Sequence, residues 1–140
     1  MATMELTVRH LGRGSAMECT TPQGLTMTFD DPDTGQHGAS PVQHLLASIG
    51  ACALIDVGII LTKKRLAFRD LRVTLTGLRR DAPPPRVFED IRLRFEVVGD
   101  IPPKVMDEVV ALSVDKYCSC AVTVRQGAPV RYESVVTPAT

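Results

Sequence analysis

The sequence lacks an excess of charge of either sign. Its 140 residues carry 16 basic and 16 acidic side chains, so the formal net charge at pH 7 is zero. Proteins that bind nucleic acid or an anionic membrane usually present a basic patch or stripe. The balance argues against polyanionic partners, and we expect neither nucleic acid nor a membrane among them.

A secretion signal is missing from the start of the sequence, and cysteine is scarce. The first residues, MATMELTVRH, contain no basic and then apolar run, which predicts a cytoplasmic location. Four cysteines (Cys19, Cys52, Cys118 and Cys120) are too few and too unevenly spaced for a disulfide scaffold. In a reducing cytoplasm we expect them to be catalytic, metal-binding or structural thiols.

Internal repeats and low-complexity tracts are also absent. The hydrophobic share of 44% is ordinary for a folded protein, and the length suits one domain. We therefore expect a single domain over residues 1–140.

Charge is almost missing from the middle of the longest apolar stretch, SPVQHLLASIGACALIDVGIILTKKR (40–65). Between Leu45 and Leu61 the only ionisable side chains are Cys52 and Asp56. The run is shorter than the roughly 18 uncharged residues of a membrane span and contains a carboxylate, so it predicts a buried core helix. Taken alone, Cys52 would be a small buried hydrophobe.

Both ends of this helix are signalled. Ser40 is a suitable N-cap and Pro41 suits the first helical position, while the cations at 63–65 favour the last turn. A single sheet can cover only one face of so apolar a helix. We expect a second copy of the chain to cover the rest, in a symmetric homodimer.

The other segments alternate between apolar and polar residues or contain turn residues. Proline and glycine mark the turns, and the three consecutive prolines of RRDAPPPR predict a hairpin connection. Strands are expected over 4–10, 16–21, 25–29, 71–75, 87–97 and 130–134, with helices over 102–117 and 118–125. Segregated antiparallel strands and helices predict an α+β fold.

Three stretches resemble the OsmC/Ohr family of thiol-dependent peroxidases, especially its YhfA-like branch. Two surround cysteines, ASPVQHLLASIGACALIDVGIILTKKR and LSVDKYCSCAVTV, and GLRRDAPPPRVFEDIRLRFEVVG resembles the paired long strands of the branch. The resemblance spans nearly the whole chain. It implies antiparallel sheets with a long central buried helix, in an intertwined homodimer with active sites at the subunit interface.

The resemblance also implies a chemistry. Cys52 would be the peroxidatic nucleophile and become a sulfenic acid, and Cys118 would resolve it as a disulfide. An external dithiol, by family analogy often a dihydrolipoyl group, would then reduce the disulfide. Neither a metal nor a flavin cofactor is needed, and the substrate is a small organic hydroperoxide.

A peroxidatic thiolate needs support from a cation or from hydrogen-bond donors. In Ohr-type relatives an arginine oriented by a glutamate supplies it. Arg13 is the best positional match to that arginine, with Arg80 and Arg86 as alternatives. The glutamate position falls at Val42, and the acid of the YhfA-like branch is replaced by Gln43.

The remaining polar groups of the two motifs have structural interpretations. Asp56 lies one turn after Cys52, where a carboxylate would raise the thiol pKa, and we expect it to pair with a cation or cap backbone groups. Cys120 lies about 200° around a helix from Cys118, so we expect it in the core, and Cys19 in strand packing. A zinc site made by Cys118, Cys120, Cys52 and a histidine is a weaker alternative, because the spacing matches no usual ligand pattern.

Two functions follow, and a structural domain with incidental cysteines is a weaker third interpretation, because both family cysteines are retained in their contexts. The first is a cysteine-based reductase of organic hydroperoxides that binds its substrate in an apolar pocket at the dimer interface. The alternative, favoured by Val42, Gln43 and Asp56, is a catalytically weak relative that acts as a thiol redox sensor or binds an apolar ligand.

Overall fold

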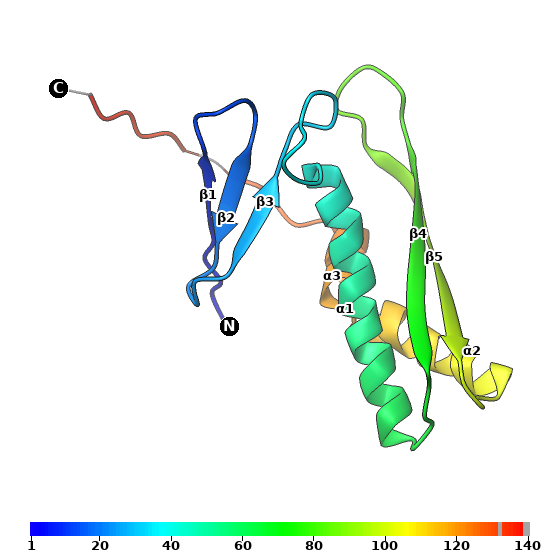
Figure 1. Cartoon of the computed structure of the whole chain (residues 1–140). Coiled ribbons are helices and arrows are strands. Elements are labelled where there is room, and N and C mark those ends of the chain that lie inside the picture. Colours follow the sequence, from blue (N-terminus) through cyan, green and yellow to red (C-terminus); the bar gives the residue numbers. More distant parts are fainter. Residues whose placement is uncertain (132, 139–140) are drawn as a thin grey trace. The chain divides into compact units, whose positions relative to one another are not determined.

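A computed structural model describes residues 1–131 and 133–138, and these form an α+β fold (Figure 1). A three-stranded sheet is followed by a long helix, a two-stranded hairpin and two further helices. The elements are β1 (Thr7–His10), β2 (Met17–Thr20), β3 (Thr26–Phe29), α1 (Pro41–Lys63), β4 (Asp70–Arg79), β5 (Phe88–Val98), α2 (Pro103–Leu112), the single π-helical turn η1 (Ser113–Tyr117) and α3 (Ser119–Gln126).

The chain divides into two compact units. The first contains residues 1–51 and 73–94, and the second contains residues 52–72 and 95–140. Helix α1 and strands β4 and β5 each contribute residues to both units.

In the first unit, β1, β2 and β3 pair in sequence order as an antiparallel meander, as predicted. The turn between β1 and β2 contains Gly12 at φ 76° and Gly14 at φ 53°, a region that glycine adopts without steric cost. On β2, Cys19 is 2% exposed, which confirms its packing role.

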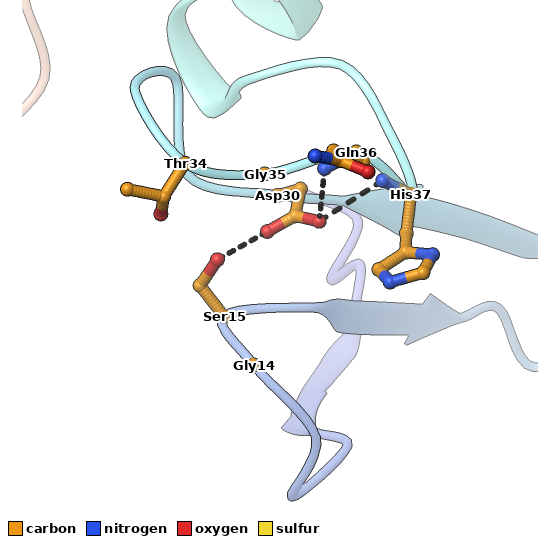
Figure 2. A pocket seen from close by; sticks show the side chains of 7 residues that line it. All are labelled: Gly14, Ser15, Asp30, Thr34, Gly35, Gln36 and His37. Carbon is orange, nitrogen blue, oxygen red and sulfur yellow. Dashed lines mark hydrogen bonds between the residues drawn. The ribbon is translucent and has the colours of Figure 1, made fainter.

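The loop from β3 to α1 is organised by Asp30, which is 1% exposed (Figure 2). Its carboxylate accepts a hydrogen bond from the Ser15 hydroxyl and from the main-chain N–H groups of Asp31, Gln36 and His37. The Ser15 hydroxyl is the largest of the influences that lower the pKa of Asp30 to about 2. This carboxylate therefore fixes the path of the chain that leads to α1.

The start of α1 is a capping box. Ser40 Oγ accepts a 3.2 Å hydrogen bond from the Gln43 N–H, and Gln43 Oε1 accepts a 2.9 Å bond from the Ser40 N–H. The predicted N-cap is confirmed, and Gln43 has a structural role. His44 Nε2 also hydrogen-bonds to the carbonyl of Thr28 at 3.0 Å, which links α1 to β3.

Further along α1, Gly50 lies against the hairpin. An added Cβ at this position would come within 2.5 Å of Leu75 Cδ1, so glycine permits the close approach of helix and strand. Residues of β4 alternate between exposed and half-buried as predicted, and the proline-rich segment joins β4 to β5.

In the second unit, the core is formed by Val57, Leu61 and Val109, each 0% exposed. Leu71, Phe95 and Val105 pack around them as partly buried side chains. Among the helices of the described residues, α1 is long and apolar enough to cross a membrane. Its Val57 and Leu61 face packs against α2 residue Val109, as in a core helix.

Two predictions about the C-terminal third are wrong. The helix expected over 102–117 ends as an α-helix at Leu112 and continues as the π-helical turn η1, because the Cys118 N–H bonds to the Ser113 carbonyl five residues back at 2.7 Å. The strand expected over 130–134 is absent from its described residues, where Val130 is 89% exposed and unpaired. Tyr132, in the middle of that segment, lies outside the described residues.

Candidate functional site

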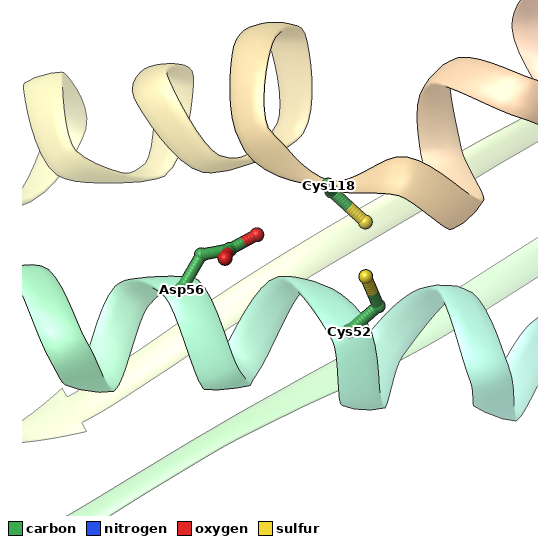
Figure 3. A group of neighbouring side chains, drawn as sticks. All are labelled: Cys52, Asp56 and Cys118. Atoms are coloured by element: carbon green, nitrogen blue, oxygen red, sulfur yellow. The ribbon is translucent and has the colours of Figure 1, made fainter. Parts of the chain in front are cut away.

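The site lies in the second unit, where the middle of α1 meets the start of α3. Cys52 and Asp56 are one turn apart on α1, and Cys118 lies at the junction of η1 and α3. One ligand atom from each of these side chains lies within 4.8 Å of the other two. Figure 3 shows the two sulfur atoms directed toward one another, with the Asp56 carboxylate beside them. The structure therefore brings together the two predicted redox cysteines.

The π-helical turn sets the position of Cys118. Cys118 is 0% exposed and has extended backbone angles, φ −73° and ψ 101°, so it is the N-cap of α3 rather than part of a helix. Its Sγ accepts a hydrogen bond from the Ala121 N–H at 3.4 Å. Ser113, at the start of η1, is buried and donates a 3.0 Å hydrogen bond to the carbonyl of Ala53, the neighbour of Cys52.

The start of α3 also supports the Cys52 sulfur. The pKa of the Cys52 thiol is lowered, chiefly by a hydrogen bond from the main-chain N–H of Cys120, although desolvation opposes this change. The thiols of Cys118 and Cys120 and the N–H of Ser119 lower it further. The first amides of a helix have no partner within the helix and carry the positive end of its dipole. The Ala121 N–H thus bonds to the Cys118 sulfur, and the N–H groups of Ser119 and Cys120 favour the ionised form of Cys52.

The pKa values of the two neighbouring thiols, Cys118 and Cys120, change in the opposite direction. Burial raises the pKa of Cys118, and its hydrogen bond to Cys52 raises it further. Burial and the hydrogen bond to Cys52 likewise raise the pKa of Cys120. Of these three thiols, Cys52 is therefore the most easily ionised.

The interpretation of Cys120 as a core residue that faces away from Cys52 is wrong. Its thiol lies close enough to Cys52 to lower the pKa of Cys52, and Cys52 in turn raises the pKa of Cys120. The 200° estimate assumed that a helix already contains Cys118, whereas α3 begins at Ser119. The π-helical turn that causes this shift could not be predicted, because its hydrophobic pattern continues that of α2.

Asp56 does not have the partners expected of it. Its Oδ2 is buried and has no hydrogen-bond partner among the described residues. The pKa of Cys52 is lowered by groups of α3 and by Cys118, so the raising effect expected of Asp56 stays a prediction.

The predicted arginines lie in the first unit. Arg13 is exposed in the turn between β1 and β2, and its role beside Cys52 stays a prediction. Arg80 forms a 3.5 Å ion pair with Glu89, and Arg86 Nε donates to the Arg80 carbonyl at 3.3 Å. The hydrogen-bond donors identified at Cys52 are neutral groups of α3 and Cys118, which sequence reasoning missed. The helix start after DKYC was the available signal for them.

A pocket of about 500 Å³ adjoins the cysteine cluster, since Asp56 belongs to both. Its walls are mainly apolar, and its volume is within the range of small-molecule sites. It is lined by Asp56, Ile59, Ile60, Lys63, Leu112 and Tyr117.

Comparisons with known proteins agree on one family. A model of the OsmC-like protein family matches residues 33–133. Protein YhfA of Escherichia coli strain K12 is 36% identical over 110 residues, which cover 78% of this chain and 81% of that protein. The structure of a hypothetical protein from Aquifex aeolicus VF5 has a TM-score of 0.78 and 32% identity, over 90% of this chain and 89% of its own.

A more distant structure has the same fold. It is described as an organic hydroperoxide resistance protein OsmC, a predicted redox protein, from Legionella pneumophila. Its TM-score is 0.63 at 18% identity, over 89% of this chain and 92% of its own.

Proposed function

The chain belongs to the OsmC-like protein family, and we propose that it is a cytoplasmic, thiol-dependent peroxidase that reduces organic hydroperoxides. The observation that carries this proposal is the facing pair of Cys52 and Cys118, whose sulfur atoms lie within 4.8 Å. The name of the Legionella pneumophila relative, organic hydroperoxide resistance protein, supports the substrate class.

The first step is attack of the Cys52 thiolate on the outer oxygen of a hydroperoxide. A sulfur–oxygen bond forms and the O–O bond breaks, which gives a sulfenic acid and, with one proton, an alcohol. The N–H groups of Ser119 and Cys120 support the thiolate before the attack. Because these donors belong to the start of a helix, they are held in place before substrate arrives.

In the second step, Cys118 attacks the sulfenic sulfur of Cys52. A disulfide forms and water leaves, with the Cys118 proton going to the departing hydroxyl. An external dithiol, of which a dihydrolipoyl group is one example, then exchanges with this disulfide and is itself oxidised. The buried position of Cys118 protects this thiol from peroxide until Cys52 has reacted.

The pocket beside Asp56 suits the organic part of the substrate. Ile59, Ile60 and Leu112 supply apolar surface for an alkyl or aryl group. We expect cumene hydroperoxide to react faster than hydrogen peroxide, because only the former gains from this surface.

We further propose that a second copy of the chain covers the outer face of α1. Ile55 is 62% exposed and Ile59, one turn later, is 49% exposed. Only 28% of the most apolar 18-residue stretch of α1 is buried within one chain. Exposed apolar area of this kind typically marks an interface. Sedimentation equilibrium should give a dimer, and a monomer at micromolar concentration would overturn this arrangement.

A redox sensor is the second candidate, and Asp56 favours it. A carboxylate within 4.8 Å of both sulfur atoms opposes negative charge on Cys52, and the identified donors to that sulfur are neutral. Such a thiol would oxidise once and slowly, without efficient turnover.

The two functions separate in one experiment. Reduced protein is mixed with cumene hydroperoxide and dihydrolipoamide, and consumption of peroxide is followed for many equivalents. Repeated turnover that is lost in Cys52→Ser and kept in Cys19→Ser supports the peroxidase. A single oxidation to a Cys52–Cys118 disulfide without turnover overturns it in favour of the sensor.

A further inference from the structure

The buried oxygen of Asp56 has no role in the redox cycle. Among the described residues, Asp56 Oδ2 is the buried side-chain oxygen or nitrogen that lacks a hydrogen-bond partner. Burying a carboxylate oxygen without a partner costs free energy, and proteins normally compensate it with a hydrogen bond, a cation or a metal ion. The sulfur atoms of Cys52 and Cys118 lie within 4.8 Å of an oxygen of this carboxylate.

These three side chains have the spacing of a metal site. Their ligand atoms all lie within 4.8 Å of one another. Tetrahedral zinc with Zn–S bonds near 2.3 Å holds two sulfur atoms about 3.8 Å apart. A contraction of about 1 Å, within reach of side-chain rotation, would bring the three atoms onto one ion. Two ligands come from successive turns of α1, and the third is the N-cap of α3.

The donor set selects the class of metal. Two thiolates favour soft or borderline ions and disfavour magnesium and calcium, which prefer all-oxygen sites. A single carboxylate is compatible with zinc, whose protein ligands are cysteine, histidine and acidic side chains.

We propose that reduced Cys52, Asp56 and Cys118 bind one zinc ion, with a water molecule in the fourth position. Binding converts the two thiols into thiolates and releases their protons to the solvent, and no electrons are transferred. The zinc ion provides the positive charge that the buried Asp56 oxygen lacks.

Zinc and peroxide would compete for the same sulfur atoms. A thiolate bound to zinc is a weaker nucleophile, and a disulfide has no thiolate to offer the metal. Zinc would therefore hold the pair reduced and inactive, and oxidation would release the ion. This regulatory consequence rests on the proposed peroxidase, whereas the metal site itself rests on the geometry alone.

The test measures zinc directly. Reduced, metal-free protein is titrated anaerobically with zinc chloride by calorimetry in two buffers of different ionisation enthalpy, which also counts released protons. One zinc per chain with proton release is expected. Cobalt(II) in place of zinc should give the charge-transfer absorption of thiolate–cobalt bonds.

Variants identify the ligands. Asp56→Asn and Cys118→Ser should each weaken zinc binding by about tenfold or more, since even the loss of a group that only hydrogen-bonds to a metal ligand costs about 10–100-fold. Cys19→Ser, on β2, should bind as the wild type does. Thermal unfolding of each variant without metal checks that it is folded.

Two results would overturn the site. These are no zinc binding by reduced wild-type protein, and binding that is equal in the wild type and a folded Asp56→Asn variant. The outcome is independent of the peroxidase assay, because zinc binding without peroxide turnover leaves the site intact and removes only the proposed enzyme. Turnover without zinc binding does the reverse.

Discussion

The hydroxyl of Ser113 donates a 3.0 Å hydrogen bond to the main-chain carbonyl of Ala53, and both residues are fully buried. The bond connects the π-helical turn that ends at Cys118 with the turn of α1 that contains Cys52. It therefore helps to hold the two redox sulfur atoms at their observed separation.

Replacing Ser113 with alanine tests this connection. We expect Ser113→Ala to lower the free energy of unfolding by about 1 kcal/mol, the usual net contribution of one hydrogen bond. The Cys52–Cys118 disulfide should also form more slowly after addition of peroxide, as measured by quenched-flow alkylation and mass spectrometry.

Thr62→Ala is the matched control for Ser113→Ala. Thr62 Oγ1 also donates to an α1 carbonyl, that of Gly58 at 2.8 Å, but this bond is exposed. Thr62→Ala should leave the rate of disulfide formation unchanged. Equal rates in the wild type and Ser113→Ala would contradict the positioning role of Ser113.

Ser119 allows removal of one N–H donor to Cys52 without loss of a side-chain contact to it. It is the first residue of α3, a position that accepts proline, and the extended backbone of Cys118 suits a residue before proline. Ser119→Pro should raise the pKa of Cys52, because the thiolate loses one of its hydrogen bonds.

The pKa change can be measured from the pH dependence of Cys52 alkylation by iodoacetamide. In the wild type the rate should rise at lower pH than for an ordinary cysteine, since the pKa of Cys52 is lowered. In Ser119→Pro the profile should move to higher pH, and in Ser119→Ala, which keeps the N–H, it should stay in place. An unchanged profile in a folded Ser119→Pro variant would exclude this amide as a support of the thiolate.

Asp56 should slow the reaction of Cys52 with peroxide. Two unit charges about 4 Å apart in water repel by about 1 kcal/mol, which corresponds to about fivefold in rate. We expect Asp56→Asn to increase the second-order rate constant with cumene hydroperoxide by about this factor at pH 7. Stopped-flow measurement of thiol oxidation would give the value, and a slower variant would indicate that the carboxylate assists the reaction.

Asp30 should make the stability of the first unit depend on pH in the acidic range. The pKa of Asp30 in the folded chain is about 2, against an ordinary value of 3.8, so the folded state favours the ionised form. Its stabilising effect is fully present above pH 3.8 and is lost as the pH falls through about 2. The midpoint of thermal unfolding should fall over this window.

Asp30→Asn should unfold at lower temperature than the wild type at pH 7 and show a smaller decline between pH 4 and 2. The amide NH₂ of asparagine would face N–H donors that now bond to a carboxylate. Asp33→Asn, at an exposed position of the same loop, is the control. Parallel pH profiles for the wild type and Asp30→Asn would contradict this account.

Much of the fold was predictable because its signals are local. Ser40 and Pro41 marked the start of α1, and alternating residues marked β4 and β5. The bond between Ser40 and Gln43 was also readable, since serine followed three residues later by glutamine is a capping-box pattern.

The candidate site was harder to predict from the sequence than the fold was. Cys52 and Cys118 were identified through family resemblance, and no local pattern specifies that their sulfur atoms face each other. The thiol contact of Cys120 depends on the π-helical turn, which one main-chain hydrogen bond at Cys118 creates and hydrophobic periodicity does not encode. The unpartnered oxygen of Asp56 depends on how η1 and α3 pack beside α1.

The first turn of α3 should respond to the oxidation state of the cysteine pair. Oxidation removes the ionised form of Cys52 that the N–H groups of Ser119 and Cys120 favour, so it should loosen the first turn of this helix and speed hydrogen exchange at those amides. The start of α3 would then report, in the backbone, an event that takes place between two side chains.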